Sequence, residues 1–185
     1  YDGSKHVSIT TLDGMSERTV TVNTTSKVYN MAGWRVGWAS GPKDIIEKIT
    51  AIQSTSVTCP TSIAQAGAIA ALNDTIGMGN LTFNQLTKKF SVRRDLVREG
   101  LLKIPGVSCI NPLGGIFMFP DFSYYEIESV NLSNRLLNEA GIGSVPGLEF
   151  GLSGENHLRI LFTSPPEEIA RGLERMQQFF KNILD

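Results

Sequence analysis

The sequence predicts an α/β fold in which a layered α/β part is followed by a smaller α+β part. Along the first part, short β-branched or apolar runs alternate with longer segments of helical periodicity. After a long amphipathic helix the runs become shorter, and the chain ends in a second strongly amphipathic helix. We therefore expect two domains, residues 1–90 and residues 91–185, with the boundary in a linking helix between residues 80 and 105.

Two strands and a helix are predicted near the start of the chain. Residues 18–23 form a β-branched run that a polar cluster ends, and residues 34–39 form an apolar run that stops at Ser-Gly-Pro. Pro42 favours the first turn of the helix that follows, in which isoleucines recur at helical spacing. We expect this stripe to lie in the core, and its members are Ile45, Ile49 and Ile52.

Two further helices are predicted before residue 106. The first begins near Pro60–Ser62, and its small residues indicate close burial between layers. Asn73–Asp74 and Gly77–Gly79 predict a break after it. The second helix is amphipathic, continues until Ile104–Gly106 and is suited to linking two domains. Its apolar side comprises Phe83, Leu86, Phe90, Val97 and Leu101.

Short strands and a helix are predicted in the next part of the chain. We expect strands near residues 107–110, 115–119 and 157–162. The helix is expected near residues 132–140, where Gly141 closes it.

The final helix has a clear start signal. Ser164 is placed as the N-cap, Pro165 as the first helical residue and Glu167 three residues after the cap, which together form a capping box. The apolar stripe of this helix should be buried, and it comprises Ile169, Leu173, Met176, Phe180 and Ile183.

The charge balance excludes several classes of protein. The chain of 185 residues carries 17 basic and 18 acidic side chains, so it lacks the basic excess of proteins that bind nucleic acid or an anionic membrane. The longest cationic cluster, Lys88–Lys89 with Arg93–Arg94, is spaced like the solvated face of a helix. No stretch approaches the roughly 20 apolar residues that cross a bilayer. Cys59 and Cys109 form neither a metal-binding nor a disulfide pattern, so we expect a cytoplasmic protein.

The segment from residue 23 to residue 37 carries most of the chemical information. Hydroxyl side chains precede Lys27, and Arg35 follows it. A surface lysine at the end of a strand is the simpler interpretation of this spacing alone. However, a lysine amine can condense with an aldehyde cofactor if a sheltered site lowers its pKa. Thr24, Ser26 and Arg35 would then supply the donors that a phosphate needs. Gly33 and Gly37 would let the backbone fold back toward the lysine.

The pattern Ser-Lys-x-Tyr-x-Met-x-Gly-Trp-Arg-x-Gly at residues 26–37 resembles the cofactor-attachment signature of the fold-type I, pyridoxal-phosphate-dependent aminotransferases of class I/II. The resemblance implies that Lys27 forms a Schiff base with the cofactor, and that Thr24, Ser26 and Arg35 bind its phosphate. Relatives often have Ser where this chain has Thr24, which keeps the hydroxyl. The implied fold is the C-terminal part of a large domain with a mostly parallel sheet, followed by a small α+β domain.

A second segment agrees with the resemblance. In residues 157–162 the strand period of two places Arg159 on the face opposite to three apolar neighbours. On its own, Arg159 would be interpreted as a surface residue at the rim of the sheet. The family has an arginine in a matching strand that binds the substrate α-carboxylate, so the resemblance gives Arg159 this role. Pro112–Phe117 resembles a loop that approaches the substrate, which makes Gly115 a further candidate, and Val145–Gly151 resembles the loop before the arginine strand.

The resemblance implies transfer of an amino group between an amino acid and a 2-oxo acid, by a homodimer. Thr58–Thr61 falls where the family often places a segment that reaches the partner subunit's site. A β-lyase or synthase on the same scaffold, and a noncatalytic effector-binding domain of a transcription regulator, remain alternatives. The match covers only the C-terminal half or so of the family's length. The aspartate that pairs with the pyridine nitrogen would precede Tyr1, so we expect a fragment that is a poor catalyst alone.

Overall fold

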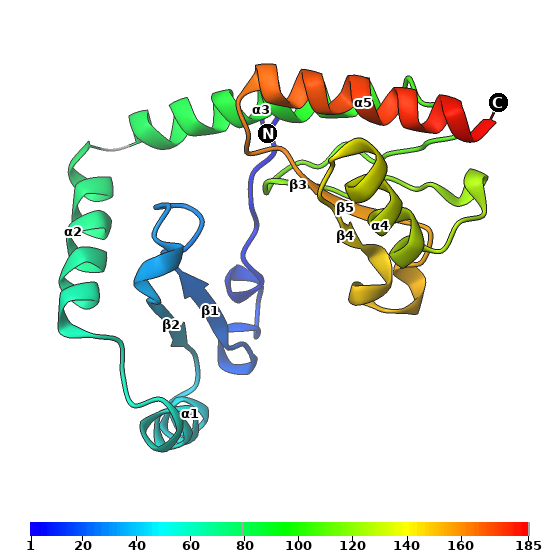
Figure 1. The fold of residues 1–185 in the computed structure, drawn as a ribbon. Helices are drawn as coiled ribbons and strands as arrows, with labels where there is room; N and C mark the ends of the chain where they lie inside the picture. Colours follow the sequence, from blue (N-terminus) through cyan, green and yellow to red (C-terminus); the bar gives the residue numbers. More distant parts are fainter. Residues whose placement is uncertain (79, 185) are drawn as a thin grey trace. The chain divides into compact units, whose positions relative to one another are not determined.

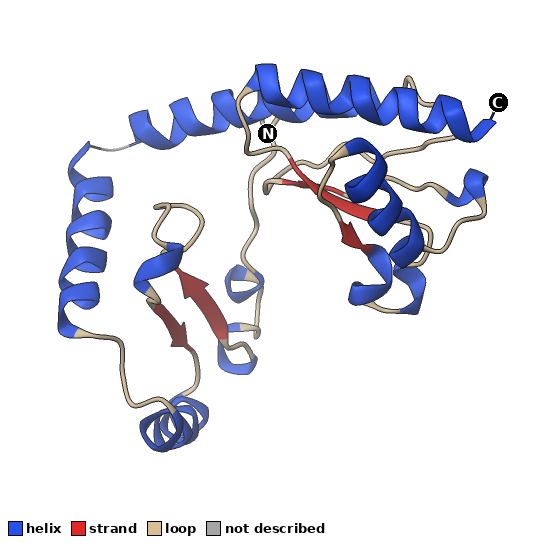
Figure 2. Ribbon diagram, in the orientation of Figure 1, coloured by secondary structure: helices blue, strands red, loops and turns tan. Residues whose placement is uncertain are grey.

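The computed structural model describes residues 1–78 and 80–184, without the side chains of residues 74–82. The chain divides into two compact units (Figure 1): residues 1–4 with 84–185 form unit 1, and residues 5–83 form unit 2. Helices and strands occur in both units, as an α/β protein requires (Figure 2). The assignment of residues 1–90 and 91–185 to the two domains of the implied fold stays a prediction. Among the described helices, none is both long and apolar enough to cross a membrane.

Unit 2 contains a two-stranded sheet. Strand β1 (Thr21–Thr24) pairs with β2 (Gly37–Ser40), and Thr24 lies opposite Gly37. This pair is antiparallel, as are the other strand pairs in the described residues, so the expectation of a mostly parallel sheet is not met here. The connection between the two strands contains only a 3₁₀ turn, η3 (Ala32–Trp34), and not the crossover helix that joins parallel strands.

The two helices of unit 2 bury little apolar surface. In α1 (Lys43–Ser56) the isoleucine stripe expected in the core is exposed, with Ile52 at 67% of its full accessibility. Among the described side chains of α2 (Ser62–Met78), a narrow alanine face is buried. The buried apolar cluster of this unit consists of Val36, Ala64 and Ala68. Helical periodicity therefore identified the apolar face of α1 correctly, but not its burial.

The break predicted after the alanine-rich helix is wrong in part. Helix α2 continues through Asn73–Asp74 and Gly77 to Met78. The preceding turns are rich in alanine, the strongest helix former, and this outweighs the modest cost of the less favourable residues that follow. Gly79, the last residue of the predicted break, lies outside the described residues.

Unit 1 is built on a three-stranded antiparallel sheet in the order β3-β5-β4. These strands are Phe117–Met118 (β3), Val145–Pro146 (β4) and Leu158–Leu161 (β5). The edge strand β4 was not expected, and an edge tolerates its proline because one side needs no ladder hydrogen bond. Residues 107–110 form only an isolated bridge, between Ser108 and Asp121, instead of the predicted strand.

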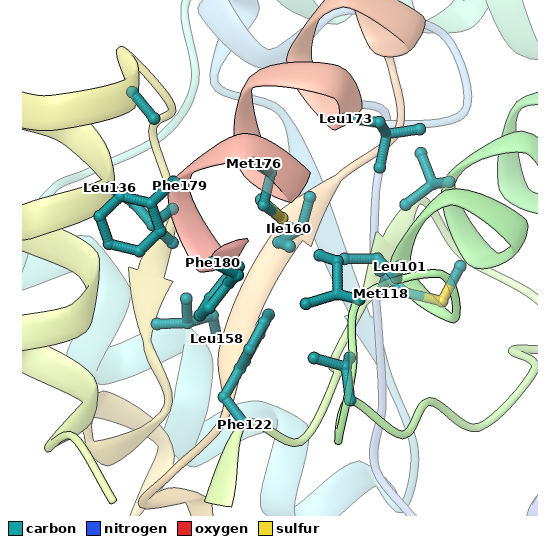
Figure 3. Packing of buried hydrophobic residues seen from close by; sticks show 14 of the residues in the cluster. Leu101, Met118, Phe122, Leu136, Leu158, Ile160, Leu173, Met176, Phe179 and Phe180 are labelled. Carbon is teal, nitrogen blue, oxygen red and sulfur yellow. The ribbon is translucent and has the colours of Figure 1, made fainter. Parts of the chain in front are cut away.

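The core of unit 1 lies between this sheet and three helices (Figure 3). Helix α3 (Asn80–Leu101), helix α4 (Ser129–Ala140) and helix α5 (Pro166–Leu184) each contribute one apolar face. The predicted stripe of α5 is confirmed except at Ile183, which is only partly buried, and Phe179 adds to it. The Phe122 ring stacks on the Phe180 ring with their centres 5.1 Å apart, and both side chains are fully buried. Aromatic contacts of this kind add to the burial of large apolar side chains.

Helix α5 starts one residue later than the capping box predicts. Its first residue is Pro166, and the carbonyl of Pro165 accepts hydrogen bonds from the N–H groups of Glu168 and Ile169. Pro165 therefore occupies the cap position, because the fixed φ angle of Pro166 suits the first helical residue.

The solvated face predicted for α3 is wrong for its two arginines. The Arg94 side chain is only 3% exposed and forms a bidentate ion pair with Asp2, with N···O distances of 2.7 and 3.0 Å. Arg94 also donates to Asp95, and Arg93 donates to the carbonyl of Thr163. The hydrogen bond from Arg94 holds the pKa of Asp2 below its usual value. Burial of Arg94 is possible because fixed partners bond to its guanidinium group.

A distant carboxylate stabilises the start of α4. The Glu155 carboxylate accepts hydrogen bonds from the N–H and the hydroxyl of Ser129, the first residue of this helix. The backbone hydrogen bond lowers the pKa of Glu155. Such a carboxylate satisfies an N–H group that has no partner within the helix and interacts favourably with the helix dipole.

We expect Glu155→Gln to lower the melting temperature at neutral pH and to flatten its dependence on acid pH. A depressed folded-state pKa contributes stability above the unfolded-state value, and this contribution is lost as pH falls through the folded-state pKa. Circular dichroism melts from pH 7 to pH 3 measure both effects. Glu174→Gln, at an exposed position of α5, is the matched control. If the two variants melt alike across the series, Glu155 does not act as the cap.

Candidate functional site

The hydroxyl residues before Lys27 form a connected cluster at the end of β1. The Thr24 and Ser26 hydroxyl oxygens lie 2.8 Å apart. The Ser26 N–H donates to the Thr24 hydroxyl at 3.1 Å, and that hydroxyl donates to the Val36 carbonyl at 2.9 Å. The carbonyl of Val36 also accepts from the N–H of Thr25 at 3.2 Å. Thr24 and Ser26 are thus brought together and tied to the residue that follows Arg35.

Arg35 stands in the turn that returns the chain to β2. Its own backbone is left-handed, with φ 57° and ψ 43°, and its Nη1 donates to the Ala32 carbonyl at 2.9 Å. We expected Gly33 and Gly37 to supply the conformational freedom for this turn, but it is Arg35 that adopts the positive φ angle. Gly37 is required for another reason, since a Cβ there would lie 2.8 Å from the carbonyl oxygen of Asn23.

Lys27 lies in the turn between β1 and η3. The Tyr29 N–H donates to the Thr25 carbonyl and the Asn30 N–H donates to the Lys27 carbonyl, both at 3.3 Å. The Lys27 side chain is exposed, so unit 2 does not itself provide the sheltered site that we expected for it. Within the described part of the chain, neither Lys27 nor Arg35 pairs with a carboxylate. Both cations are therefore available to an anionic ligand.

An apolar hollow of about 610 Å³ lies beside Arg35. The segment Cys59–Thr61 lines it together with Trp34, and the Trp34 ring rests on α2 at Gly67, where a Cβ would lie 2.6 Å from the ring. Trp34 therefore packs on a helix while remaining partly exposed. The Thr58–Thr61 segment is thus placed near Arg35 within unit 2.

Arg159 lies on β5 in unit 1, facing away from the core. Leu158 and Ile160 on either side of it are buried, which confirms the predicted alternation. The Arg159 Cζ atom lies 4.7 Å from the centre of the Phe117 ring and 5.0 Å from that of Phe150. Its Nε is buried without a hydrogen-bond partner, and no carboxylate pairs with the guanidinium in the described residues.

Two further rings, those of Phe119 and His157, extend the aromatic contacts beyond Phe150. Phe119 stacks on His157 with ring centres 4.9 Å apart and meets the edge of Phe150 at 5.8 Å. His157 Nδ1 lies 3.0 Å from the carbonyl oxygen of Glu155. Sequence reasoning placed Phe117 and Phe150 in loops matched by the resemblance, but did not find their contact with Arg159. That contact depends on where β3 and the turn after β4 lie beside β5, which the sequence pattern does not reveal.

Gly115 lies in the exposed loop before β3. Its φ angle is +80°, and no atom lies within 4 Å of the position that a Cβ would take. The Tyr1 hydroxyl donates to its carbonyl. Glycine is needed here for the left-handed backbone and not for a close approach. Gly115 and Arg159 belong to unit 1, and Lys27, Thr24, Ser26 and Arg35 belong to unit 2.

Comparison of the sequence with known proteins finds aminotransferases, both by a family model and by individual relatives. The model of the family described as aminotransferase class I and II matches residues 1–176. An aspartate aminotransferase of Pyrococcus abyssi is 36% identical over 181 residues, and an aromatic-amino-acid aminotransferase 2 of Thermococcus litoralis is 34% identical over 181 residues. Each alignment covers 98% of this chain and 46% of the relative.

Solved structures agree with the sequence matches. The crystal structure of an aromatic aminotransferase from Pyrococcus horikoshii superposes with a TM-score of 0.90 at 36% identity, covering 98% of this chain and 48% of that one. An aspartate aminotransferase from Rhizobium meliloti superposes with a TM-score of 0.86 at 33% identity, covering 98% of this chain and 46% of that one. The chain thus spans about half the length of the relatives it matches.

Proposed function

Because the chain belongs to the aminotransferase class I and II family, we propose that it carries the cofactor lysine and the carboxylate-binding arginine of a pyridoxal-phosphate-dependent aminotransferase. The observation that carries the proposal is the cluster at the end of β1. There, two hydrogen-bonded hydroxyls lie within one short strand pair and its turn, together with a lysine and an arginine that pair with no carboxylate in the described residues.

The side chains in this cluster fit the proposed cofactor. A phosphate ester requires hydrogen-bond donors and positive charge. The Thr24 and Ser26 hydroxyls can rotate from their present partners to donate to it, and Arg35 adds the charge without a competing carboxylate among the described residues. The aldehyde requires a primary amine close by in the chain, and Lys27 follows Ser26 directly. We therefore assign the phosphate to Thr24, Ser26 and Arg35, and the aldehyde carbon to Lys27 Nζ.

When bound, pyridoxal phosphate supplies a carbon that accepts amines and a ring that withdraws electrons from it. We assign the binding of the substrate and the movement of its proton to residues of this chain. Arg159 binds and orients the α-carboxylate of the amino acid with its guanidinium. Lys27 Nζ accepts the α-proton of the substrate as a general base and later returns a proton as a general acid. We also assign Gly115 to the substrate site, because its left-handed backbone shapes the loop before β3.

We place the substrates among amino acids and their 2-oxo acids. The relatives are named for aspartate and for aromatic amino acids, so these are the donors to test first. We also propose a homodimer, supported by the exposed isoleucine stripe of α1, which needs an apolar cover. A cytoplasmic location is supported by two cysteines that are both free.

The first half of the reaction distinguishes transamination from the alternatives. The full-length protein that carries this chain is loaded with pyridoxal phosphate, freed of excess cofactor, and mixed with aspartate or phenylalanine without an acceptor. We expect about one equivalent of 2-oxo acid per cofactor and no free ammonia, because the amino group stays on the cofactor. A β-lyase would instead release ammonia continuously. If neither amino acid yields any oxo acid, the protein does not transaminate these donors and the proposal fails for them.

A further inference from the structure

We propose that Phe117 and Phe150, here called the aromatic pair, are positioning residues that orient the Arg159 guanidinium toward a substrate carboxylate. The inference rests on the carboxylate-binding role proposed for Arg159. It gives a role to two individual residues that the sequence pattern placed only within matched loops.

The aromatic pair reaches Arg159 from two segments far apart in the sequence. Phe117 belongs to β3, which pairs with β5, and Phe150 ends the turn η5 (Gly147–Phe150) that follows β4. The guanidinium carbon lies within 5.0 Å of the centre of each ring. At such distances the negative face of an aromatic ring attracts a guanidinium group.

The turn that carries Phe150 is held firmly in place. Gly147 and Gly154 approach so closely that a Cβ on Gly147 would lie 1.9 Å from the Gly154 carbonyl oxygen. The Gly147 N–H also donates to the His157 carbonyl at 2.8 Å, which ties the turn to the start of the arginine strand. Phe150 is thus presented by a segment that is anchored to β5 itself.

Among the described residues, no ion pair competes with the aromatic pair for Arg159. The Nε of Arg159 is buried and unpartnered, and no carboxylate bonds to the guanidinium in the part of the chain that the structure describes. An arginine has several rotatable bonds, so without a fixed partner it would lose conformational entropy on binding a ligand. Ring contacts restrict the side chain beforehand and leave its charge unneutralised, as a site for an anion needs.

The chain offers a matched control in Phe119. Its ring contacts Phe150 and His157 and is not among the rings over the Arg159 guanidinium. Phe150 is 51% exposed and Phe119 is 40% exposed, so replacing either should leave the fold intact. Phe150→Leu and Phe119→Leu therefore remove rings of the same kind, but only the first removes a ring that contacts the arginine.

Arginine side-chain NMR of the full 185-residue chain tests the proposal without requiring catalysis. The Nε–Hε signal of Arg159, identified by its loss in Arg159→Lys, is followed during titration with pyruvate, a 2-oxo monocarboxylate. The ring currents of the aromatic pair should displace this signal in the free protein. We expect Phe150→Leu to reduce the displacement and to raise the pyruvate dissociation constant about 3- to 30-fold. Phe119→Leu should stay within about twofold, and Phe150→Tyr should bind like the unmodified chain.

Two results would overturn the proposal in different ways. If the unmodified chain binds pyruvate at Arg159 and Phe150→Leu binds it equally well, the aromatic pair does not position the arginine, while the proposed function stands. If the Arg159 signal does not respond to pyruvate at all, the carboxylate role of Arg159 fails together with the aromatic pair. The release of oxo acid described above tests transamination separately.

Discussion

Replacement of Lys27 by alanine is expected to reduce transamination by at least about 10³-fold, because the variant loses both the amine that attaches the cofactor and the base that moves the substrate proton. The structure gives Lys27 no ion pair within the described residues, so little stability should be lost with it. The expected signs are disappearance of the visible cofactor absorbance that is characteristic of attachment to lysine, and loss of oxo acid formation.

The control for this variant is Lys48→Ala, which removes an exposed lysine from α1 in the same unit. It should keep the absorbance and the activity. Retention of a reducible covalent adduct in Lys27→Ala would show that another amine holds the cofactor, and the assignment of the cluster at the end of β1 would be wrong.

Replacement of Arg159 by alanine is expected to raise KM for the amino acid by a factor that corresponds to roughly 2–5 kcal/mol of lost binding. The substrate carboxylate would then lie beside Phe117 and Phe150 without a cation to pair with it. Steady-state kinetics of the cofactor-loaded protein measure this effect. Arg159→Lys should recover part of the loss, since lysine keeps the charge but not the bidentate geometry.

Arg171→Ala, which removes an exposed arginine of α5, controls for the general loss of positive charge. Circular dichroism should show the same melting temperature for this variant and the unmodified chain. An unchanged KM in Arg159→Ala, with the fold intact, would mean that a different group binds the carboxylate.

Local periodicity predicted the buried faces of β5 and α5 well. The strand period of two placed Arg159 opposite to Leu158 and Ile160, and the structure confirms it because these neighbours are buried under α5. The stripe of α5 was found for the same reason, since its amphipathic pattern is long and regular. In both cases the burial of one face follows directly from the pattern along a single element.

Predictions that depended on partners distant in the sequence were less successful. Arg94 was expected in solvent, but it is buried because Asp2, 92 residues away in the sequence, pairs with it. The stripe of α1 is apolar as predicted, yet the described residues do not cover it. The left-handed turn at Arg35 and the rings beside Arg159 depend on how strands come together, which no local pattern encodes.

The sequence predicted the residue types of the candidate site, but little of its geometry. The Thr24–Ser26 contact agrees with the donors that the sequence proposed for a phosphate. The exposure of Lys27 does not agree with the sheltered environment expected for it. This difference has a physical reason, because the buried apolar cluster in the described residues of unit 2 is small and does not enclose the Lys27 side chain.

Attachment of the cofactor to Lys27 is the central claim, and borohydride reduction tests it most directly. The protein is incubated with pyridoxal phosphate, reduced, digested and examined by mass spectrometry. We predict a single stable phosphopyridoxyl adduct on the peptide that contains Lys27. An adduct on any other lysine, or no adduct at saturating cofactor, would contradict the account.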